Sequence, residues 1–378
     1  MFACFVHTTS RVLSTSTGPS ERYHPRTVPH LHLQLGAMNK TRRALLTSVA
    51  TGAIVAASSS FAKGRGSDHR GSNDGNHLAL EIQDLFRDLP DRTAFKVWAP
   101  SAGDGPDFSV QLHENRKMFT ASTNKSYILC ERLRQLDSPT VTAQLESHEL
   151  PLNQDVYSPG SPVFNPPDLS GLVSERTAME AMVVHSDNTA TDMVLKEAGA
   201  GNVRKFIASI GLKNTMIPDS TRIFAAYLLG APDYRTITWD ELLSIPPGPL
   251  AYPFLNDVQT FASSPADLVS FFSRALAGKF FTHGQTLQEF RRILSLGDIN
   301  YLVRFPLGIS TFGKAGYADI AGSHARSIAG GLYFPDRWVY FSFVLNWDAE
   351  ELNDAPTVEA FYTAIRETAR LLRERLGA

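Results

Sequence analysis

Residues 119–125 read Phe-Thr-Ala-Ser-Thr-Asn-Lys and place the hydroxyl of Ser122 three positions before the amine of Lys125. The next residues, 127–134 (YILCERLR), are typical of a helix, so Ser122 is expected in its first turn. Side chains three positions apart share a helix face, so Lys125 can reach the Ser122 oxygen. The helix N-terminus favours a developing negative charge. The stretch therefore predicts an activated serine. Residues 60–63 (SFAK) have the same Ser-x-x-Lys spacing, which shows that the pattern also occurs by chance. The alternative is a helix-capping serine followed by a solvated lysine.

A second polar group lies at residues 185–192 (HSDNTATD). Ser186 and Asn188 put a hydroxyl and a carboxamide on one side of a short loop, which suits proton relay and the holding of a substrate amide. Apolar residues 193–195 follow directly, so the triplet taken alone is better explained as a helix cap.

A third group, residues 311–317 (TFGKAGY), has the pattern of a strand that carries the cation of Lys314. The small residues Ala315 and Gly316 would let a ligand approach the strand backbone closely. The Tyr317 N–H could then point at a substrate carbonyl. Taken alone, an exposed strand lysine before a turn is the simpler interpretation.

The rest of the chain suggests one sheet built from its two ends. Residues 94–100 and 108–112 predict a hairpin, and residues 308–317, 326–334 and 338–347 predict three successive strands. A short amphipathic helix is expected from residue 78, and a final helix after the last strand, while the segment from 136 to about 296 looks mainly helical. This arrangement predicts a sheet with a helical insertion.

The N-terminal part has the layout of an export signal. Residues 1–37 lack periodicity, and residues 38–62 contain paired arginines and a diluted apolar run, as in a twin-arginine signal peptide. Residues 63–76 are polar and Gly-rich, which predicts a flexible linker. We therefore expect a periplasmic or secreted protein with no stable membrane span; a disordered basic tail is the alternative. The start could be Met1 or Met38, with Met38 favoured and 1–37 then a non-native extension.

Composition excludes several classes of function. The chain has 36 basic and 38 acidic residues, so nothing points to nucleic acid or an anionic membrane. Of its two cysteines, Cys4 precedes the signal and Cys130 is expected in the core, so no internal disulfide is predicted. No metal-ligand spacing occurs, and we expect no metal, no cofactor and a monomer.

The order Ser-x-x-Lys, Ser-Asp-Asn, Lys-x-Gly resembles the signature set of class A β-lactamases and penicillin-binding proteins. The resemblance runs from about Asp91 to the C-terminus and includes residues 260–268 (TFASSPADL), which look like the helix after the omega loop of that family. It implies an α/β (α+β) fold over residues 77–378, with an antiparallel sheet flanked by helices and an all-helical lobe at about 138–300.

The resemblance also implies roles for these residues. Ser122 would be the acylated nucleophile and Lys125 its base, kept neutral by burial and by the charge of Lys314. Ser186 would deliver a proton to the leaving nitrogen. The remaining residues would bind the substrate. Asn188 would hold its side-chain amide, and Lys314 would attract its carboxylate. The N–H groups of Ser122 and of Tyr317, which follows Gly316, would stabilise the oxyanion.

Two departures from the family pattern stand out. Ala315 replaces the usual Thr or Ser, which removes one hydrogen bond to a substrate carboxylate. Residues 210–224 lack the Glu-x-x-Asn element that activates water in class A enzymes, and Asp219 is the only acid there. Asp219 is therefore a candidate water activator, while Asp192 is expected to form a structural ion pair with Arg222.

The motifs and the two departures from the family pattern are compatible with three functions. The first is a β-lactamase-like serine hydrolase acting on a small β-lactam or peptide-like amide. The second is an acyl-enzyme former without efficient deacylation, such as a penicillin-binding-like peptidase, an esterase or a biosynthetic enzyme. The third is a non-catalytic binding protein. A Ser-His-Asp hydrolase is a distant competitor, because no Gly-x-Ser-x-Gly elbow occurs and His185 and His324 are more simply explained as loop or packing residues.

Overall fold

The computed structural model describes residues 70–101, 106–320, 322–334, 337–351 and 354–376. The expected extension (1–37), the export signal (38–62) and residues 63–69 of the linker lie outside them. Helix α1 spans Arg70–Asp84, so residues 70–76 are helical and not a flexible linker as expected. Leu78 and Ile82, buried one turn apart, anchor this helix, and hydrogen bonding then propagates upstream from the nucleated turns.

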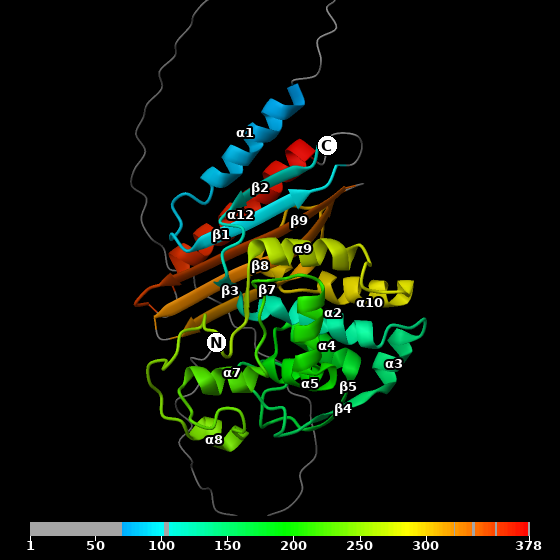
Figure 1. Cartoon of the computed structure of the whole chain (residues 1–378), viewed down its shortest axis with the longest axis vertical. Coiled ribbons are helices and arrows are strands. Elements are labelled where there is room, and N and C mark those ends of the chain that lie inside the picture. Colours follow the sequence, from blue (N-terminus) through cyan, green and yellow to red (C-terminus); the bar gives the residue numbers. More distant parts are fainter. Residues whose placement is uncertain (1–69, 102–105, 321, 335–336, 352–353, 377–378) are drawn as a thin grey trace, which may run out of the picture. The chain divides into compact units, whose positions relative to one another are not determined.

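The central sheet confirms the expected assembly from both ends of the chain (Figure 1). Its strand order is β2-β1-β9-β8-β7, and every neighbouring pair is antiparallel. The strands are β1 (Thr93–Ala99), β2 (Phe108–Leu112), β7 (Ser310–Ile320), β8 (Ser323–Phe334) and β9 (Arg337–Asp348). β1 pairs with β9, so the N-terminal hairpin extends the C-terminal three-stranded meander, and β7 is an edge strand.

Helices cover both faces of the sheet. α1 and α12 (Ala355–Leu376) pack on one face, and α9 (Pro265–Leu276) packs on the other (Figure 1). Successive residues of β8 show the two-residue period of a strand, because Ile328 belongs to the core under α12 and Ala329 to the core under α9. Burial on both faces explains why most residues of β8 and β9 are buried, with no alternation of buried and exposed positions.

The segment expected to be mainly helical carries eight described helices, one short strand pair and one strand of a second pair. The helices are α3 (Val141–Ser147), α4 (Glu175–Val184), α5 (Asn188–Ala198), α6 (Ala200–Ser209), α7 (Thr221–Leu228), α8 (Trp239–Ser244), α9 and α10 (Gly284–Ser295), and α11 (Ile299–Val303) follows. The pairs are β4 (Glu149–Leu152) with β5 (Gly171–Ser174), and β3 (Met118–Phe119) with β6 (Ala262–Ser263).

Helix α2 (Lys125–Gln135) runs through the centre of this helical part. Tyr127, Ile128, Leu129 and Leu133 are fully buried, as is Cys130, which confirms the expected core cysteine. A helix buried on all sides is fixed by its neighbours, so whatever precedes it in the chain is held rigidly. None of the helices in the described ranges is both long and apolar enough to cross a bilayer.

Candidate active site

A tight turn between β3 and α2 positions Ser122. Residues Ala121–Asn124 form a 3-10 turn, and α2 itself begins only at Lys125. Ala121 has a φ of 46°, in the left-handed region that is strained for alanine. Asn124 secures the turn by donating from Nδ2 to the Ala262 carbonyl (2.9 Å) and the Met216 carbonyl (3.0 Å). Ser122 is thereby left partly exposed at the mouth of a pocket.

Lys125 connects the first two sequence motifs. Its side chain is fully buried, and Nζ donates to the Ser186 carbonyl (2.7 Å) and to Asn188 Oδ1 (2.8 Å), with Ser186 Oγ at 3.4 Å. The hydrogen bonds of the described residues include none from the Ser122 hydroxyl. Contact between Ser122 and Lys125 therefore stays a prediction, whereas contact of Lys125 with Ser186 and Asn188 is present.

The surroundings of Lys125 lower its basicity. Burial first, and then the positive charge of Lys314, lower the pKa of Lys125 to about 7, against smaller opposing effects of Asp187, Asp192 and Asp298. A large share of the amine is therefore neutral near pH 7. A neutral amine is what a general base must be before it accepts a proton.

Asp187 resolves the question of whether the Ser-Asp-Asn triplet is only a helix cap. Its carboxylate accepts from the Ala190 N–H at the start of α5 (2.8 Å) and from the N–H groups of Val163 and Phe164 (both 2.9 Å). The capping residue is thus Asp187, and its neighbours Ser186 and Asn188 line the pocket instead. Ser186 has a φ of 56°, which is unfavourable for serine.

Lys314 lies inside the protein, next to a carboxylate. It is fully buried, and its ammonium forms an ion pair with the buried carboxylate of Asp298 and donates to the Ala315 carbonyl (2.8 Å). Asp298 also accepts from the Ala315 N–H (2.8 Å). Lys314 is not among the described residues that line the pocket, so its expected contact with a substrate carboxylate stays a prediction. Asp298 lies 16 positions earlier, in a separate helical turn, and no local pattern connects it to Lys314.

Gly316 permits a close approach, but the approaching group belongs to the protein. A Cβ at this position would lie 2.4 Å from the Thr120 carbonyl oxygen and 2.8 Å from the Ser122 nitrogen. Only glycine therefore lets the edge strand β7 contact the turn that carries Ser122. Ser122 and Tyr317, whose N–H groups were the predicted oxyanion donors, consequently line one pocket.

The predicted ion pair between Asp192 and Arg222 is wrong. The Asp192 carboxylate accepts from the main-chain N–H groups of Thr221 (2.7 Å) and Arg222 (3.1 Å), at the start of α7. The Arg222 guanidinium turns away and donates to the carbonyls of Gln154 (2.6 Å) and Asp155 (2.9 Å). Peptide N–H groups at a helix start satisfy a buried carboxylate without a second side chain. Burial nevertheless raises the pKa of Asp192 to about 6.

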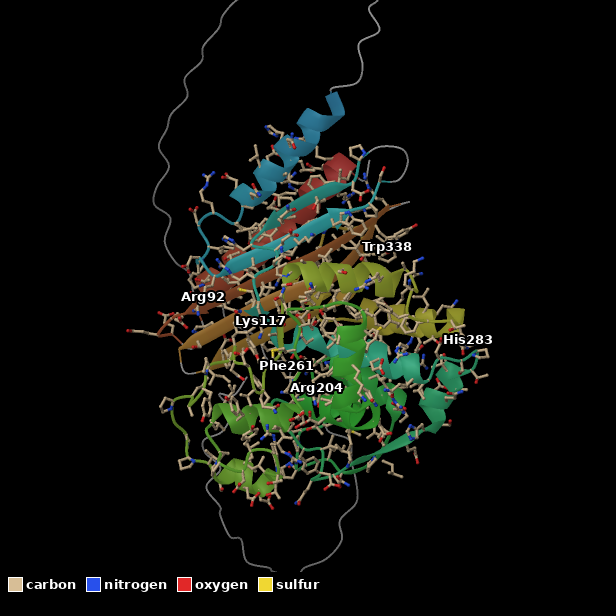
Figure 2. All side chains as sticks on the ribbon, viewed as in Figure 1. Arg92, Lys117, Arg204, Phe261, His283 and Trp338 are labelled. Carbon is tan, nitrogen blue, oxygen red and sulfur yellow. The ribbon has the colours of Figure 1, made fainter. Side chains whose placement is uncertain are left out.

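Asp219 is not positioned to activate water. It pairs with Arg204 (2.8 Å), which is labelled in Figure 2, and accepts from Gln259 Nε2 (2.7 Å). It does not line the pocket, where α7 instead presents the hydroxyl of Thr221. The expected loop carboxylate is therefore committed to a structural contact.

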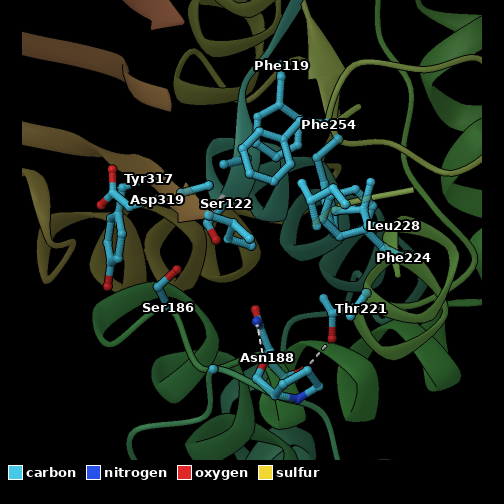
Figure 3. A pocket seen from close by; sticks show the side chains of 18 of the residues that line it. Phe119, Ser122, Ser186, Asn188, Thr221, Phe224, Leu228, Phe254, Tyr317 and Asp319 are labelled. Carbon is cyan, nitrogen blue, oxygen red and sulfur yellow. Dashed lines mark hydrogen bonds between the residues drawn. The ribbon is translucent and has the colours of Figure 1, made fainter. Parts of the chain in front are cut away.

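The pocket itself is a cavity of about 190 Å³ with one polar and one apolar side. Figure 3 shows the hydroxyls of Ser122 and Ser186 pointing toward the same space, with Asn188 below them. The apolar side is formed by Phe119, Phe224, Leu228, Leu229, Leu250, Phe254 and Phe261. Among the described residues, no group of three or more His, Cys, Asp or Glu side chains could hold a metal ion.

Comparison with solved structures identifies the fold as that of class A β-lactamases. The chain matches PBP-A with a TM-score of 0.58 at 17% identity, covering 79% of this chain and 97% of that one. It matches the TLA-3 extended-spectrum β-lactamase with a TM-score of 0.60 at 16% identity, covering 80% and 100% of the two chains. A β-lactamase from Chitinophaga pinensis DSM 2588 gives a TM-score of 0.60 at 16% identity, covering 79% and 99%.

A family model described as the β-lactamase enzyme family matches residues 77–371. The chain therefore belongs to that family, which confirms the resemblance to class A β-lactamases and penicillin-binding proteins and the expected α+β fold. No curated protein sequence matches the chain.

Proposed function

We propose that this member of the family is a serine hydrolase that forms an acyl-enzyme on Ser122. One observation carries the proposal: a fully buried lysine with a pKa near 7 contacts Ser186 and Asn188 in the wall of the pocket that Ser122 lines. An apolar pocket that is lined by a partly exposed serine and has a weakly basic amine hydrogen-bonded to its wall is suited to nucleophilic catalysis.

The proposed acylation uses residues of three elements. Neutral Lys125 accepts the Ser122 proton, directly or through the Ser186 hydroxyl, while Oγ of Ser122 bonds to the substrate carbonyl carbon. The carbonyl oxygen gains negative charge, which the N–H groups of Ser122 and Tyr317 stabilise. The bond to the leaving group then breaks, and the proton passes from Lys125 through Ser186 to the leaving atom.

Deacylation is proposed to be slow. The one carboxylate among the described residues that line the pocket is Asp319, and it is held by Arg326 (2.9 Å) and His324 (2.8 Å). No free carboxylate is thus available near Ser122 to activate water. A long-lived acyl-enzyme favours the peptidase or esterase alternative over a fast β-lactamase. One PBP-A variant was solved as an acyl-enzyme with penicillin G, on the same fold (TM-score 0.57, 18% identity, 79% and 97% covered).

Intact-mass spectrometry tests the proposal. The mature protein is mixed separately with penicillin G, a chromogenic cephalosporin and a small activated ester, and sampled over time. We expect a mass increase on Ser122 with at least one of them, lost in Ser122→Ala. Rapid turnover without an adduct would support a fast β-lactamase, and no adduct and no turnover with any acyl donor would leave a binding protein.

We also propose export to the periplasm or the exterior, with the twin-arginine signal removed, and a monomeric mature chain. The paired arginines and the apolar run of residues 38–62 support export. N-terminal sequencing of secreted material and native mass spectrometry test both points, because an intact N-terminus or a stable dimer would contradict them.

A further inference from the structure

The charges around the pocket differ from what a carboxylate-bearing substrate needs. Neither lysine nor arginine occurs among the described residues that line the cavity, and Asp319 is their one formally charged side chain. The rest of the wall opposite Ser122 consists of aromatic and aliphatic groups. A substrate carboxylate entering here would lose hydration and meet no lysine or arginine side chain among the described lining residues; the imidazole of His185 also lines the cavity.

Arg326 is paired inside the sheet with Asp319, the carboxylate that lines the pocket. Arg326 on β8 binds Asp319 on β7 through two parallel contacts, Nη1 to Oδ1 and Nη2 to Oδ2, both 2.9 Å. Its Nη1 also donates to the Ala325 carbonyl (2.8 Å), and its guanidinium lies 5.5 Å from the ring centroid of Trp347. Burial alone would raise the pKa of Asp319, but the hydrogen bonds and charges of Arg326 and His324 hold it below the usual range. Asp319 therefore stays ionised and keeps Arg326 paired.

The other cations near the pocket are committed as well. Lys314 is fully buried against Asp298. Arg222, at the start of α7, donates from its guanidinium N–H groups to the main-chain carbonyls of Gln154 and Asp155. Lys125 gives its hydrogen bonds to Ser186 and Asn188.

We propose that the pocket selects neutral, apolar acyl groups, so that the substrates are esters or amides of aliphatic or aryl carboxylic acids and not acids bearing a second carboxylate. This inference rests on the proposed function, since it names the substrate class of the same site. In the reaction, the Ser122 oxygen bonds to the acyl carbon, and the alcohol or amine leaves with the Ser122 proton. Water then takes the acyl group and releases the free acid.

A series of p-nitrophenyl esters tests the proposal with the full mature chain. From acetate to hexanoate we expect kcat/KM to rise about fourfold per added methylene, until the cavity is filled. The deciding pair is hemisuccinate and 4-methylpentanoate, which match in size while the latter has an isopropyl group in place of the carboxylate. We expect 4-methylpentanoate to be preferred by at least about tenfold. Equal rates, or a preference for hemisuccinate, would overturn the proposal.

Labelling by a fluorophosphonate separates this inference from the proposed function. If Ser122 is labelled but hemisuccinate is preferred, the substrate class is wrong and the nucleophile stands. If no serine is labelled and no ester is turned over, the proposed function fails and the inference with it.

The Asp319→Asn variant tests the charge argument directly. It removes the anion that neutralises Arg326, so the relative rate with hemisuccinate should rise by about tenfold. Asp137→Asn is the matched control, because Asp137 is also a hydrogen-bonded carboxylate but lies outside the pocket lining. Should Asp319→Asn fail to fold, Leu250→Arg adds a cation from the loop side of the same pocket and should shift the preference in the same direction. An unchanged preference in the folded variant would overturn the proposal.

Discussion

Two buried lysines, Lys125 on α2 and Lys314 on β7, have no exposed surface and very different surroundings. Lys125 is hydrogen-bonded to a carbonyl and an amide oxygen, which are neutral, and its pKa falls to about 7. Lys314 is bound to a carboxylate, which opposes the effect of burial on its pKa. Burial lowers the pKa of both lysines, but only Lys314 has a carboxylate in contact that opposes this shift, so the comparison teaches that the partner of a buried lysine matters as much as its burial.

The strongest test of this comparison is Lys125→Met, which keeps the volume and removes the amine. We expect acylation of Ser122 to slow by about 10⁴-fold, because the amine proposed to accept the Ser122 proton is then absent. The measurement is the rate of adduct formation by intact mass. Lys196→Met serves as control, since that side chain is 54% exposed. A loss below tenfold would show that another group accepts the proton.

Breaking the ion pair between Lys314 and Asp298 should mainly lower the stability of the fold, and should affect the rate of acylation less. Asp298→Asn leaves the Lys314 ammonium buried and unpaired, and we expect it to lower the free energy of unfolding by about 3–5 kcal/mol. Urea denaturation measures the loss. The double variant Asp298→Asn/Lys314→Met should recover much of it, because neither charge then remains. Equal stability of the single and double variants would contradict a charge-based cause.

The pH dependence of acylation sharpens the comparison. With the Lys125 pKa at about 7, the rate should rise about tenfold per pH unit below that value and level off above it, since only the neutral amine accepts a proton. Removing both Lys314 and Asp298 charges should move this midpoint upward, because Lys314 exerts the larger of their two effects on Lys125. A midpoint that stays in place would show that Lys314 does not influence the base.

The smallest effect is expected at Asp192. Its raised pKa means that the folded state binds more protons than the unfolded state between about pH 4 and pH 6, so stability falls as pH rises through this window. Asp192→Asn should lose this slope and change the free energy of unfolding at pH 7 by about 1 kcal/mol. Chemical denaturation at pH 4 and pH 7 measures both. A slope as steep as that of the wild type would assign the effect to another group.

Local sequence patterns predicted much of the architecture. Apolar runs separated by turn residues predicted the β1–β2 hairpin and the three strands β7, β8 and β9. The order of the motifs predicted that Lys125, Ser186 and Asn188 lie together, and the structure shows these contacts. The partners of charged groups were less predictable: Asp187, and not its neighbours, caps α5, and Asp192 binds peptide N–H groups where a side-chain partner was expected.

By itself, the sequence determined the strands and the buried helix α2, because these depend on spacings within a few residues of each other. It also determined the family, through the order of three short motifs along the chain. Only the tertiary structure decided which charges are available. Asp298 meets Lys314, and Asp319 meets Arg326, through the packing of segments that no short pattern relates. Coulomb energy depends on distance in space and on burial, and neither is written in the order of residues. The same packing exposes Ser122 to the pocket and pairs Lys314 and Arg326 with carboxylates, so that neither cation lines the pocket.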